Sequence, residues 1–320
     1  MDEMTQVRAL RAEAPAPDRA RLASGRTRLT EAARAGERHQ GLWRRRELVI
    51  LAVVAAVTAV AVTVTVLLGG TSPGRKVEPA GTPNASLKGL SAAQLLKQAA
   101  DLVETEPDSA VPGADQWIYT LQMSEAPAAA VVEMPSWIRY DGSASASEDL
   151  ARKGQRPQLI VTPLHLENGG EGDDRSPREM YQVLTALPAG GGQTLKFLRR
   201  KNAVADRAGQ TRAESDYTEI SVLLGAHVMT SKGLASLYRA LATLPGGKVT
   251  DHLVKDVMGR RVIVLTYVRR GTLKSGEADQ WLFDPQTYRI TGTRMLLDGK
   301  VVGGNSTAAW AVVDKAGERG

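Results

Sequence analysis

The longest apolar run in the chain predicts a transmembrane helix. Residues Leu48–Leu68 (LVILAVVAAVTAVAVTVTVLL) form 21 consecutive positions without a charge, a glycine or a proline. At the rise of an α-helix these residues extend about 31 Å, which matches the hydrocarbon thickness of a bilayer. The Gly- and Pro-containing residues 69–74 that follow are expected to end the helix.

Residues on the N-terminal side of this segment predict its orientation. Trp43 would lie at the headgroup level, and Arg44, Arg45 and Arg46 directly precede the apolar run. Because basic residues accumulate on the cytoplasmic side, we expect a cytoplasmic N-terminus and an extracellular C-terminal part. A cleaved signal peptide fits poorly, since 47 residues precede the run and no small-residue cleavage site follows it. A buried core helix also fits poorly, because Val and Ala occupy every face.

The N-terminal tail, residues 1–47, contains one predicted amphipathic helix, from Pro17 to about Arg34. Leu22 and Leu29 are seven residues apart and share a face of it. The tail is too short to bury a core of its own. Two interpretations stay open: a segment that docks on a cytoplasmic partner through these leucines, or an anchor that lies against anionic lipid.

A linker rich in small and turn-forming residues, 69–90, leads into a predicted outer domain, 91–320. The pairs Ser91/Gln94 and Ser176/Glu179 have the spacing of helix capping boxes, and Pro177 suits a first helical position. Apolar residues at helical spacing predict helices at 91–104, from 176 onward, and at 193–200, 211–229 and 231–244.

The other periodic segments of this domain are predicted strands. Two-residue alternation or short β-branched runs occur at 116–123, 130–134, 137–145, 158–166, 248–254, 261–269, 280–283, 287–297 and 307–313. We expect residues 314–320 to be loose. The predicted fold class is α+β: an antiparallel sheet with helices against one face, and a half-open barrel as one such arrangement.

Composition excludes several classes of function. The chain has no cysteine, so disulfides, thiolate zinc sites and a thiol nucleophile are absent. The net charge is +6, but residues 1–47 carry 11 Lys+Arg against 7 Asp+Glu. The basic character therefore belongs mostly to the tail beside the membrane, and we expect no nucleic-acid binding by the outer domain.

The sequence carries no recognisable catalytic or cofactor motif. No pair of the four histidines (His39, His165, His227 and His252) has metal-ligand spacing, and neither HExxH nor GxSxG occurs. The run 189–192 (AGGG) lacks the Lys and Ser/Thr of a phosphate loop, so we interpret it as a flexible connection. The acids of loop 167–174 lack EF-hand spacing. We therefore predict a protein that is not an enzyme and has no cofactor and no metal.

Aromatic residues of the outer domain cluster on the predicted strands, as in Trp117/Tyr119, Trp137/Tyr140 and Trp281/Phe283. The favoured interpretation is a core packed between a curved sheet and helices. The alternative is a groove for lipid or another apolar ligand.

Several segments together resemble a known family. They are SPREMYQVL (176–184), LYRALATLPG (237–246), the D-x-x-GRR pattern at 256–261 and WLFDPQTYRITGTR (281–294), combined with the Arg-rich tail and the single span. This combination resembles a family of actinobacterial single-pass membrane proteins of unassigned function, whose genes often neighbour those of extracytoplasmic-function sigma factors. The resemblance covers nearly the whole chain, but its motifs are structural, and no functional residue carries over from it.

The resemblance implies a regulator whose tail binds a sigma factor and whose outer domain senses the envelope. The tail departs from zinc-binding anti-sigma domains, because it has no cysteine and only His39. The sheet-and-helix pattern also distantly resembles lipoprotein-carrier and sigma-regulator sensor domains. The first hypothesis is thus an envelope sensor or regulator linked to sigma-factor signalling. The alternative is an anchored module that binds lipid or another apolar ligand.

Overall fold

The architecture is that of a computed structural model, which describes residues 87–126, 130–148, 157–164, 166, 175–201, 210–268 and 276–320. All of them belong to one compact unit. The cytoplasmic tail, the transmembrane segment and most of the linker predicted from the sequence lie outside these residues. Within the described ranges, no helix combines the length and the apolar character that crossing a membrane requires.

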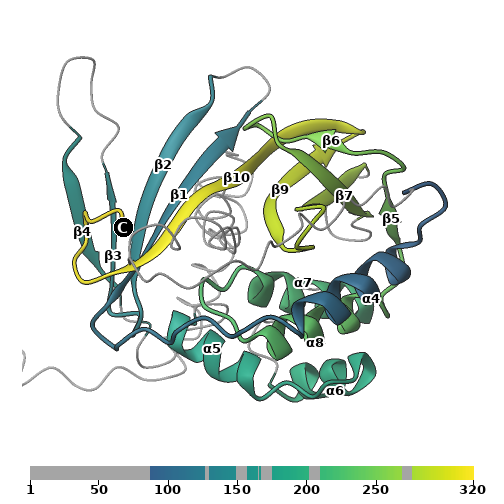
Figure 1. Cartoon of the computed structure of the whole chain (residues 1–320), viewed down its shortest axis with the longest axis horizontal. Coiled ribbons are helices and arrows are strands. Elements are labelled where there is room, and N and C mark those ends of the chain that lie inside the picture. The colour runs from purple at the N-terminus through teal and green to yellow at the C-terminus, as the bar shows by residue number, and fades with distance from the viewer. Residues whose placement is uncertain are drawn as a thin grey trace, which may run out of the picture. The chain divides into compact units, whose positions relative to one another are not determined.

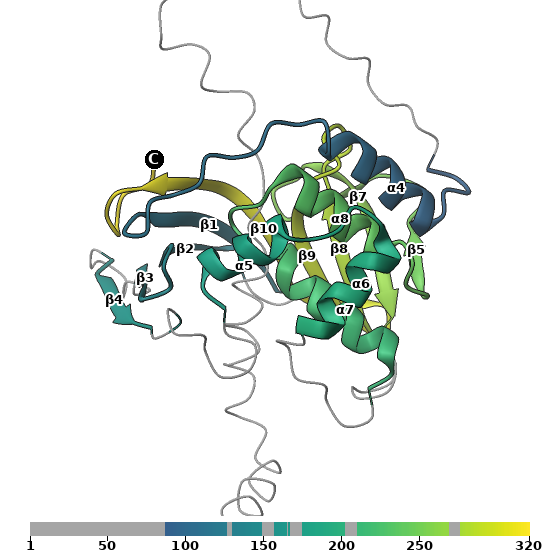
Figure 2. The same ribbon diagram turned by 90° about the horizontal axis from the view of Figure 1, so that it is seen from below.

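A single antiparallel sheet organises the described residues (Figures 1 and 2). Its strands are β1 (Trp117–Glu125), β2 (Val132–Arg139), β3 (Ala144–Glu148), β4 (Leu159–Pro163), β5 (Gly247–Val249), β6 (Val254–Lys255), β7 (Arg261–Val268), β8 (Glu277–Phe283), β9 (Ile290–Leu297) and β10 (Lys300–Val313). The strand order is β4-β3-β2-β1-β10-β9-β8-β7-β5, and β6 pairs with β7 outside this path. Two meanders therefore meet at the β1–β10 pair. This confirms the predicted α+β class with an antiparallel sheet.

The described residues contain five helices: α4 (Ala92–Val103), α5 (Pro177–Thr185), α6 (Gly191–Lys201), α7 (Arg212–Leu224) and α8 (Ser231–Leu241). Four of them cover the β7–β9 half of the sheet, and α5 also reaches β1 and β2 (Figure 2). α8 is central: α4, α5, α6 and α7 all pack on it. The predicted capping boxes at Ser91 and Ser176 are confirmed, each with its reciprocal pair of hydrogen bonds.

The main core lies between these helices and one face of the sheet, here called the helix face. Trp281 and Phe283 of β8 point into it and are 3% and 0% exposed. Trp281 donates its indole N–H to the Tyr217 hydroxyl of α7 (2.9 Å), and the Tyr267 hydroxyl of β7 donates to the carbonyl of Leu241 in α8 (3.0 Å). Burial raises the pKa of the Tyr267 phenol, so this donor stays protonated.

A second, smaller core lies on the opposite, outer face of the sheet. Tyr119 of β1 and Trp137 of β2 stack there with ring centroids 5.2 Å apart. The C-terminal segment covers them: Trp137 donates its indole N–H to the carbonyl of Glu318 (2.6 Å), and Arg319 pairs with Glu148. The expectation that residues 314–320 are loose is therefore wrong, because they close this core.

The two halves of the sheet present different chemistry on the helix face. In β7–β9 this face is apolar and packed against helices. In β1–β4 the same face is mixed. Ile118 and Ile138 pack there against Tyr181 of α5, and beyond them the face carries the hydroxyls of Thr120, Ser136, Ser145, Ser147 and Thr162. A 2.7 Å hydrogen bond joins the Thr120 and Ser136 hydroxyls.

The aromatic clusters predicted from the sequence pack in the hydrophobic cores, as the favoured interpretation expected.

Candidate functional site

The two edges of the sheet differ in how they are protected. At one edge, β5 has only three residues, and α4 packs against it. At the other edge, β4 lies far from the helices (Figures 1 and 2) and all five of its residues are exposed. Leu159, Ile160 and Val161 are 37%, 47% and 51% exposed. An exposed apolar edge strand is a template on which another strand can pair, so this edge is the candidate functional site.

The hydrogen-bonding direction of β4 follows from its pairing with β3. Leu164 donates its backbone N–H to the carbonyl of Ser143, its register partner (2.8 Å). Hydrogen-bonded and free positions alternate along an antiparallel strand, so Thr162 and Ile160 also bond to β3. Leu159, Val161 and Pro163 therefore direct their backbone polar groups away from β3, toward the free edge.

Two prolines, Pro157 and Pro163, lie on either side of the exposed apolar residues of this edge. Pro163 occupies an outward position, where its missing N–H removes no bond to β3. Pro157 is exposed and lies two residues before β4 begins. The edge thus offers two N–H donors, those of Leu159 and Val161, between two prolines.

No charge interrupts the segment 157–164 (PQLIVTPL). Natural edge strands are often blunted by lysine or another charged residue, and this one is not. A neighbouring ion pair, Glu148 with Arg319, is neutral overall. The outer side of the edge also borders the C-terminal segment, because the Leu159 side chain lies close to Gly317.

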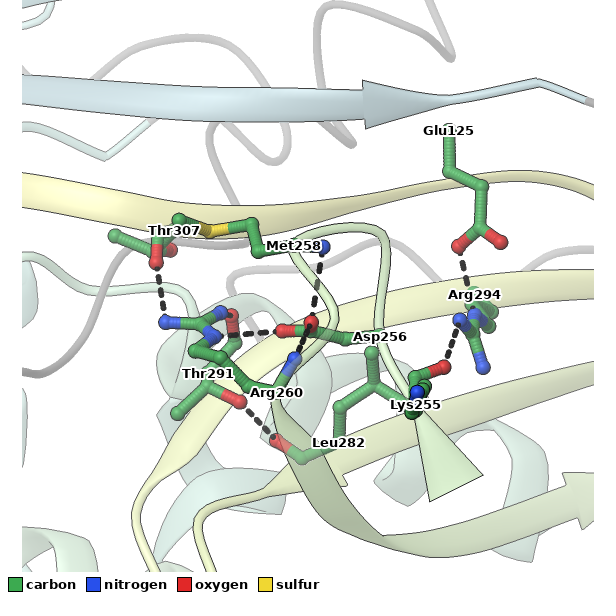
Figure 3. A network of polar contacts seen from close by, with 9 residues as sticks. All are labelled: Glu125, Lys255, Asp256, Met258, Arg260, Leu282, Thr291, Arg294 and Thr307. Carbon is green, nitrogen blue, oxygen red and sulfur yellow. Dashed lines mark hydrogen bonds and ion pairs between the residues drawn. The ribbon is translucent and has the colours of Figure 1, made fainter. Parts of the chain in front are cut away.

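A polar network on the outer face was the other candidate, and its geometry assigns it a structural role (Figure 3). The β6–β7 hairpin turns at residues 256–260. The fully buried carboxylate of Asp256 accepts the backbone N–H groups of Met258 (2.9 Å) and Arg260 (2.8 Å), and the Arg260 Nε–H (2.7 Å). These bonds fold the turn upon itself and aim the Arg260 guanidinium at the sheet.

Arg260 reaches two places where the sheet is irregular. The register skips Thr291 between β8 and β9, and skips Ala308 between β1 and β10, so each of these pairings contains a bulge. Arg260 donates from Nη1 to the Thr307 carbonyl (3.0 Å), and its Nη2 lies 3.5 Å from the Thr291 carbonyl. Bulges bend strands, and this side chain stabilises the polar groups at both bends.

A second arginine completes the attachment of the hairpin. Arg294 of β9 donates from Nη2 to the carbonyl of Lys255 in β6 (2.8 Å) and from Nε to Glu125 of β1 (2.7 Å). The hairpin is thereby fixed to β9 and β10, and Arg294 links it in turn to Glu125 of β1. The D-x-x-GRR pattern in the sequence encodes this attachment rather than a reactive centre.

None of the site residues proposed from the sequence can be placed. Leu22, Leu29, Trp43, Arg44, Arg45 and Arg46 all lie outside the described residues. In the described ranges, no group of three or more His, Asp or Glu side chains is arranged to hold a metal ion. Sequence reasoning identified a strand at 158–166 but not its importance, although prolines at both ends of an apolar run are a signal for an edge strand.

Comparison with known proteins gives no relative from which function could be transferred. No family model matches the chain, and no curated protein matches it. Among solved structures, the MucA/MucB complex from Pseudomonas aeruginosa aligns with 69% of this chain and 56% of its own, at 12% identity and a TM-score of 0.25. A structure of MucB aligns with 72% and 60%, at 12% identity and a TM-score of 0.27. The alignments thus span less than two thirds of those chains.

Proposed function

We propose that this protein is a membrane-anchored, non-enzymatic sensor or regulator of the cell envelope, whose outer domain acts by binding another polypeptide. The observation that carries the proposal is the exposed, uncharged edge of β4, with outward N–H groups at Leu159 and Val161. An extended peptide can add a strand to such an edge, because backbone hydrogen bonds supply affinity and exposed side chains supply selectivity.

Two ion pairs of the described domain have a structural role. Arg175 pairs with Glu219 (2.5 Å) and both side chains are 8% exposed. Arg289 pairs with Glu106, 183 positions earlier in the chain. Pairs of this kind hold distant segments together, whereas catalytic carboxylates need a cleft and a shifted pKa.

The anchor and the tail belong to the proposal on the strength of the sequence. The apolar run 48–68 would place the outer domain outside the cell, with Trp43 and the Arg44–Arg46 cluster at the cytoplasmic interface. The family resemblance implies that the tail would then bind a sigma factor, and the spacing of the predicted helix suggests Leu22 and Leu29 as the contacts. The alternative of an apolar ligand site was motivated by aromatic residues, and these are packed in cores.

A photo-crosslinking experiment in living cells tests the outer domain. A crosslinking amino acid is placed at Ile160 in the full-length protein, and at Val268 as a control with similar exposure, 47% against 52%. We expect a discrete protein adduct from position 160 that position 268 does not give and that Val161→Lys removes. Absence of any adduct at position 160, or the same adducts at both positions, would refute binding at this edge.

A co-purification experiment tests the tail separately. The double variant Leu22→Asp/Leu29→Asp should lose a bound sigma factor that the unaltered protein retains. Ser24→Asp/Thr27→Asp adds the same charge within the same predicted helix and should retain it. If no sigma factor accompanies the unaltered protein, the tail is an anchor and not a docking segment.

A further inference from the structure

We propose that residues 314–320, here called the C-terminal strap, act as a conformational switch for the β4 edge. The docked strap keeps β3 and β4 ordered, and release of the strap loosens both strands. The proposal rests on the proposed function and adds how its binding edge is regulated. It is carried by the path of the strap, by the sparse attachment of β3 and β4, and by the weak contacts that hold the strap in place.

The path of the strap crosses the outer face of β1 and β2 and ends beside β3 and β4 (Figure 1). Trp137 of β2 donates its indole N–H to the carbonyl of Glu318 (2.6 Å). Arg319 then pairs with Glu148, the last residue of β3. One short segment, continuous with β10, is therefore bonded to both β2 and β3.

Apart from the strap, β3 and β4 have few attachments to the rest of the sheet. β3 pairs with β2 over three register positions, whereas β1 pairs with β2 over eight. β4 pairs with β3 alone, and all five of its residues are exposed, so no helix covers it. The strap lies beside its first residue, because a Cβ built on Gly317 would be 3.3 Å from Cδ2 of Leu159. The strap thus supplies contacts that these two strands lack elsewhere.

The opposite end of the β3–β4 pair is held independently of the strap. Leu166 donates its backbone N–H to the carbonyl of Gly142 in the β2–β3 turn (3.3 Å). Gly142 in turn leaves no room for a Cβ against Ser176, the N-cap of α5. Release of the strap should therefore loosen the end that contains Glu148 and Leu159 more than the turn end.

The contacts of the strap are weak enough for it to open while the main core stays folded. The side chains of Arg319 and Glu148 are 50% and 20% exposed, and water screens an ion pair in such a position. The Glu318 carboxylate serves the strap itself, because it accepts two backbone N–H groups of the same segment (both 3.1 Å). Segments with few buried contacts open at a lower free energy than the core.

An ordered edge favours strand addition. A loose strand loses more conformational entropy when a polypeptide pairs with it, so its affinity is lower. The docked strap should therefore raise the affinity of β4 for a polypeptide, and by reciprocity a polypeptide bound at β4 should stabilise the docked strap. A molecule that competes with the strap for Trp137 and Tyr119 would lower the affinity at β4.

Hydrogen exchange of the full-length protein in detergent tests the switch without any partner. Trp137→Phe/Arg319→Ala removes both bonds of the strap and keeps an aromatic ring in the outer core. We expect the exchange of the Ile160 and Thr162 amides, which bond to β3, to accelerate by about tenfold at Ile160 and less at Thr162, with β8 unchanged. The matched control is Lys315→Ala, which removes an exposed side chain of the strap and neither bond, and it should leave both amides protected.

A chemical crosslink distinguishes release of the strap from damage to the fold. Because the chain has no cysteine, Glu148→Cys/Arg319→Cys introduces a single reactive pair. This variant should show fast exchange at Ile160, and a flexible bismaleimide that joins positions 148 and 319 should restore slow exchange. Unchanged exchange in Trp137→Phe/Arg319→Ala, or fast exchange that the crosslink does not slow, would overturn the switch.

Photo-crosslinking from position 160 in living cells separates the switch from the proposed function. Trp137→Phe/Arg319→Ala should reduce the adduct severalfold, and Lys315→Ala should not. An adduct of full strength from a variant with fast exchange would overturn the switch while retaining the proposed function. If the unaltered protein gives no adduct, the proposed function fails, and the exchange experiment by itself decides whether the strap orders β3 and β4.

Discussion

Two adjacent glycines at the start of α6 allow a sharp test of how the helices pack. A Cβ built on Gly191 would lie 2.3 Å from the carbonyl oxygen of Arg239 in α8 and 2.7 Å from its carbonyl carbon. A Cβ on Gly192 would meet no heavy atom within 4 Å. Gly191→Ala and Gly192→Ala therefore make the same chemical change one position apart, with opposite structural consequences.

The magnitude follows from the distance that α6 would have to move. Ordinary contact begins at 3.4 Å, so relief of the 2.3 Å approach needs a shift of about 1 Å. Both atoms of Arg239 that the Cβ would meet belong to the backbone, so neither can turn aside as a side chain could. The shift would also loosen Leu195 and Leu198, which α6 buries. Overpacking costs about 3 kcal/mol at its upper end, and alanine returns up to about 1 kcal/mol as a better helix former. We expect Gly191→Ala to destabilise by about 2 kcal/mol.

The matched variant should move in the other direction. Gly192→Ala has no clash and should stabilise the protein by a few tenths of a kcal/mol to about 1 kcal/mol. Urea unfolding of the full-length protein in detergent, followed by tryptophan fluorescence, measures both variants. A Gly191→Ala protein that unfolds at or above the wild-type midpoint, or a Gly192→Ala protein that loses as much stability, would refute the packing of α6 on α8.

Three further predictions concern other contacts. Asp256→Ala should cost about 3 kcal/mol in the same unfolding assay, because three donors lose a buried acceptor, and Asp256→Asn should cost less. Deletion of residues 315–320 should shift tryptophan emission to the red by exposing Trp137; unchanged emission would show that other groups bury it. Hydrogen bonding from Arg239 lowers the pKa of Glu104. At pH values above the ordinary Glu pKa, the Arg239–Glu104 pair should therefore stabilise the protein by about 0.5–1 kcal/mol. The stability difference between Arg239→Gln and wild type should shrink as pH falls through the folded pKa of Glu104, leaving the weaker bond to Asp101.

Local signals in the sequence predicted the helix beginnings correctly. Ser91 and Ser176 cap their helices as their spacing to a residue three positions later indicates, and this information is contained in four consecutive residues. The strand at Trp117 and the sharing of one face by alternate residues were also correct, because a two-residue period needs no knowledge of the partner strands.

Features that depend on distant contacts were not predictable in the same way. Residues 189–192 were interpreted as a flexible connection, but Gly191 begins α6 and is glycine because α8 lies against it. The single strand expected at 248–254 is divided into β5 and β6, since the second half leaves the sheet path and crosses the outer face. The predicted helix 211–229 ends at Leu224, and the following residues form a turn into α8.

For the candidate site, the strand itself could be predicted from the sequence, but its position in the sheet could not. Apolar, β-branched residues at 158–166 identified a strand, and the prolines could have identified an edge. Which edge it is, and whether a helix covers it, depends on the pairing of β1 with β10, which are about 190 positions apart in sequence. Local patterns contain no information on that pairing.

The order of the strands explains why β4 remains exposed. The four helices α5–α8 follow β4 in the chain and precede β5. Their core contacts are mostly with β7, β8 and the start of β9, and α5 also packs against β1 and β2 through Tyr181. The first meander runs away from β10 in the opposite direction, so each strand from β1 to β4 lies further from the helix layer (Figure 2). The C-terminal segment covers the outer face of β1–β3 but contributes no strand beyond β4. Within the described domain, the free edge is thus a consequence of the topology, and its prolines limit pairing there to a short window rather than removing it.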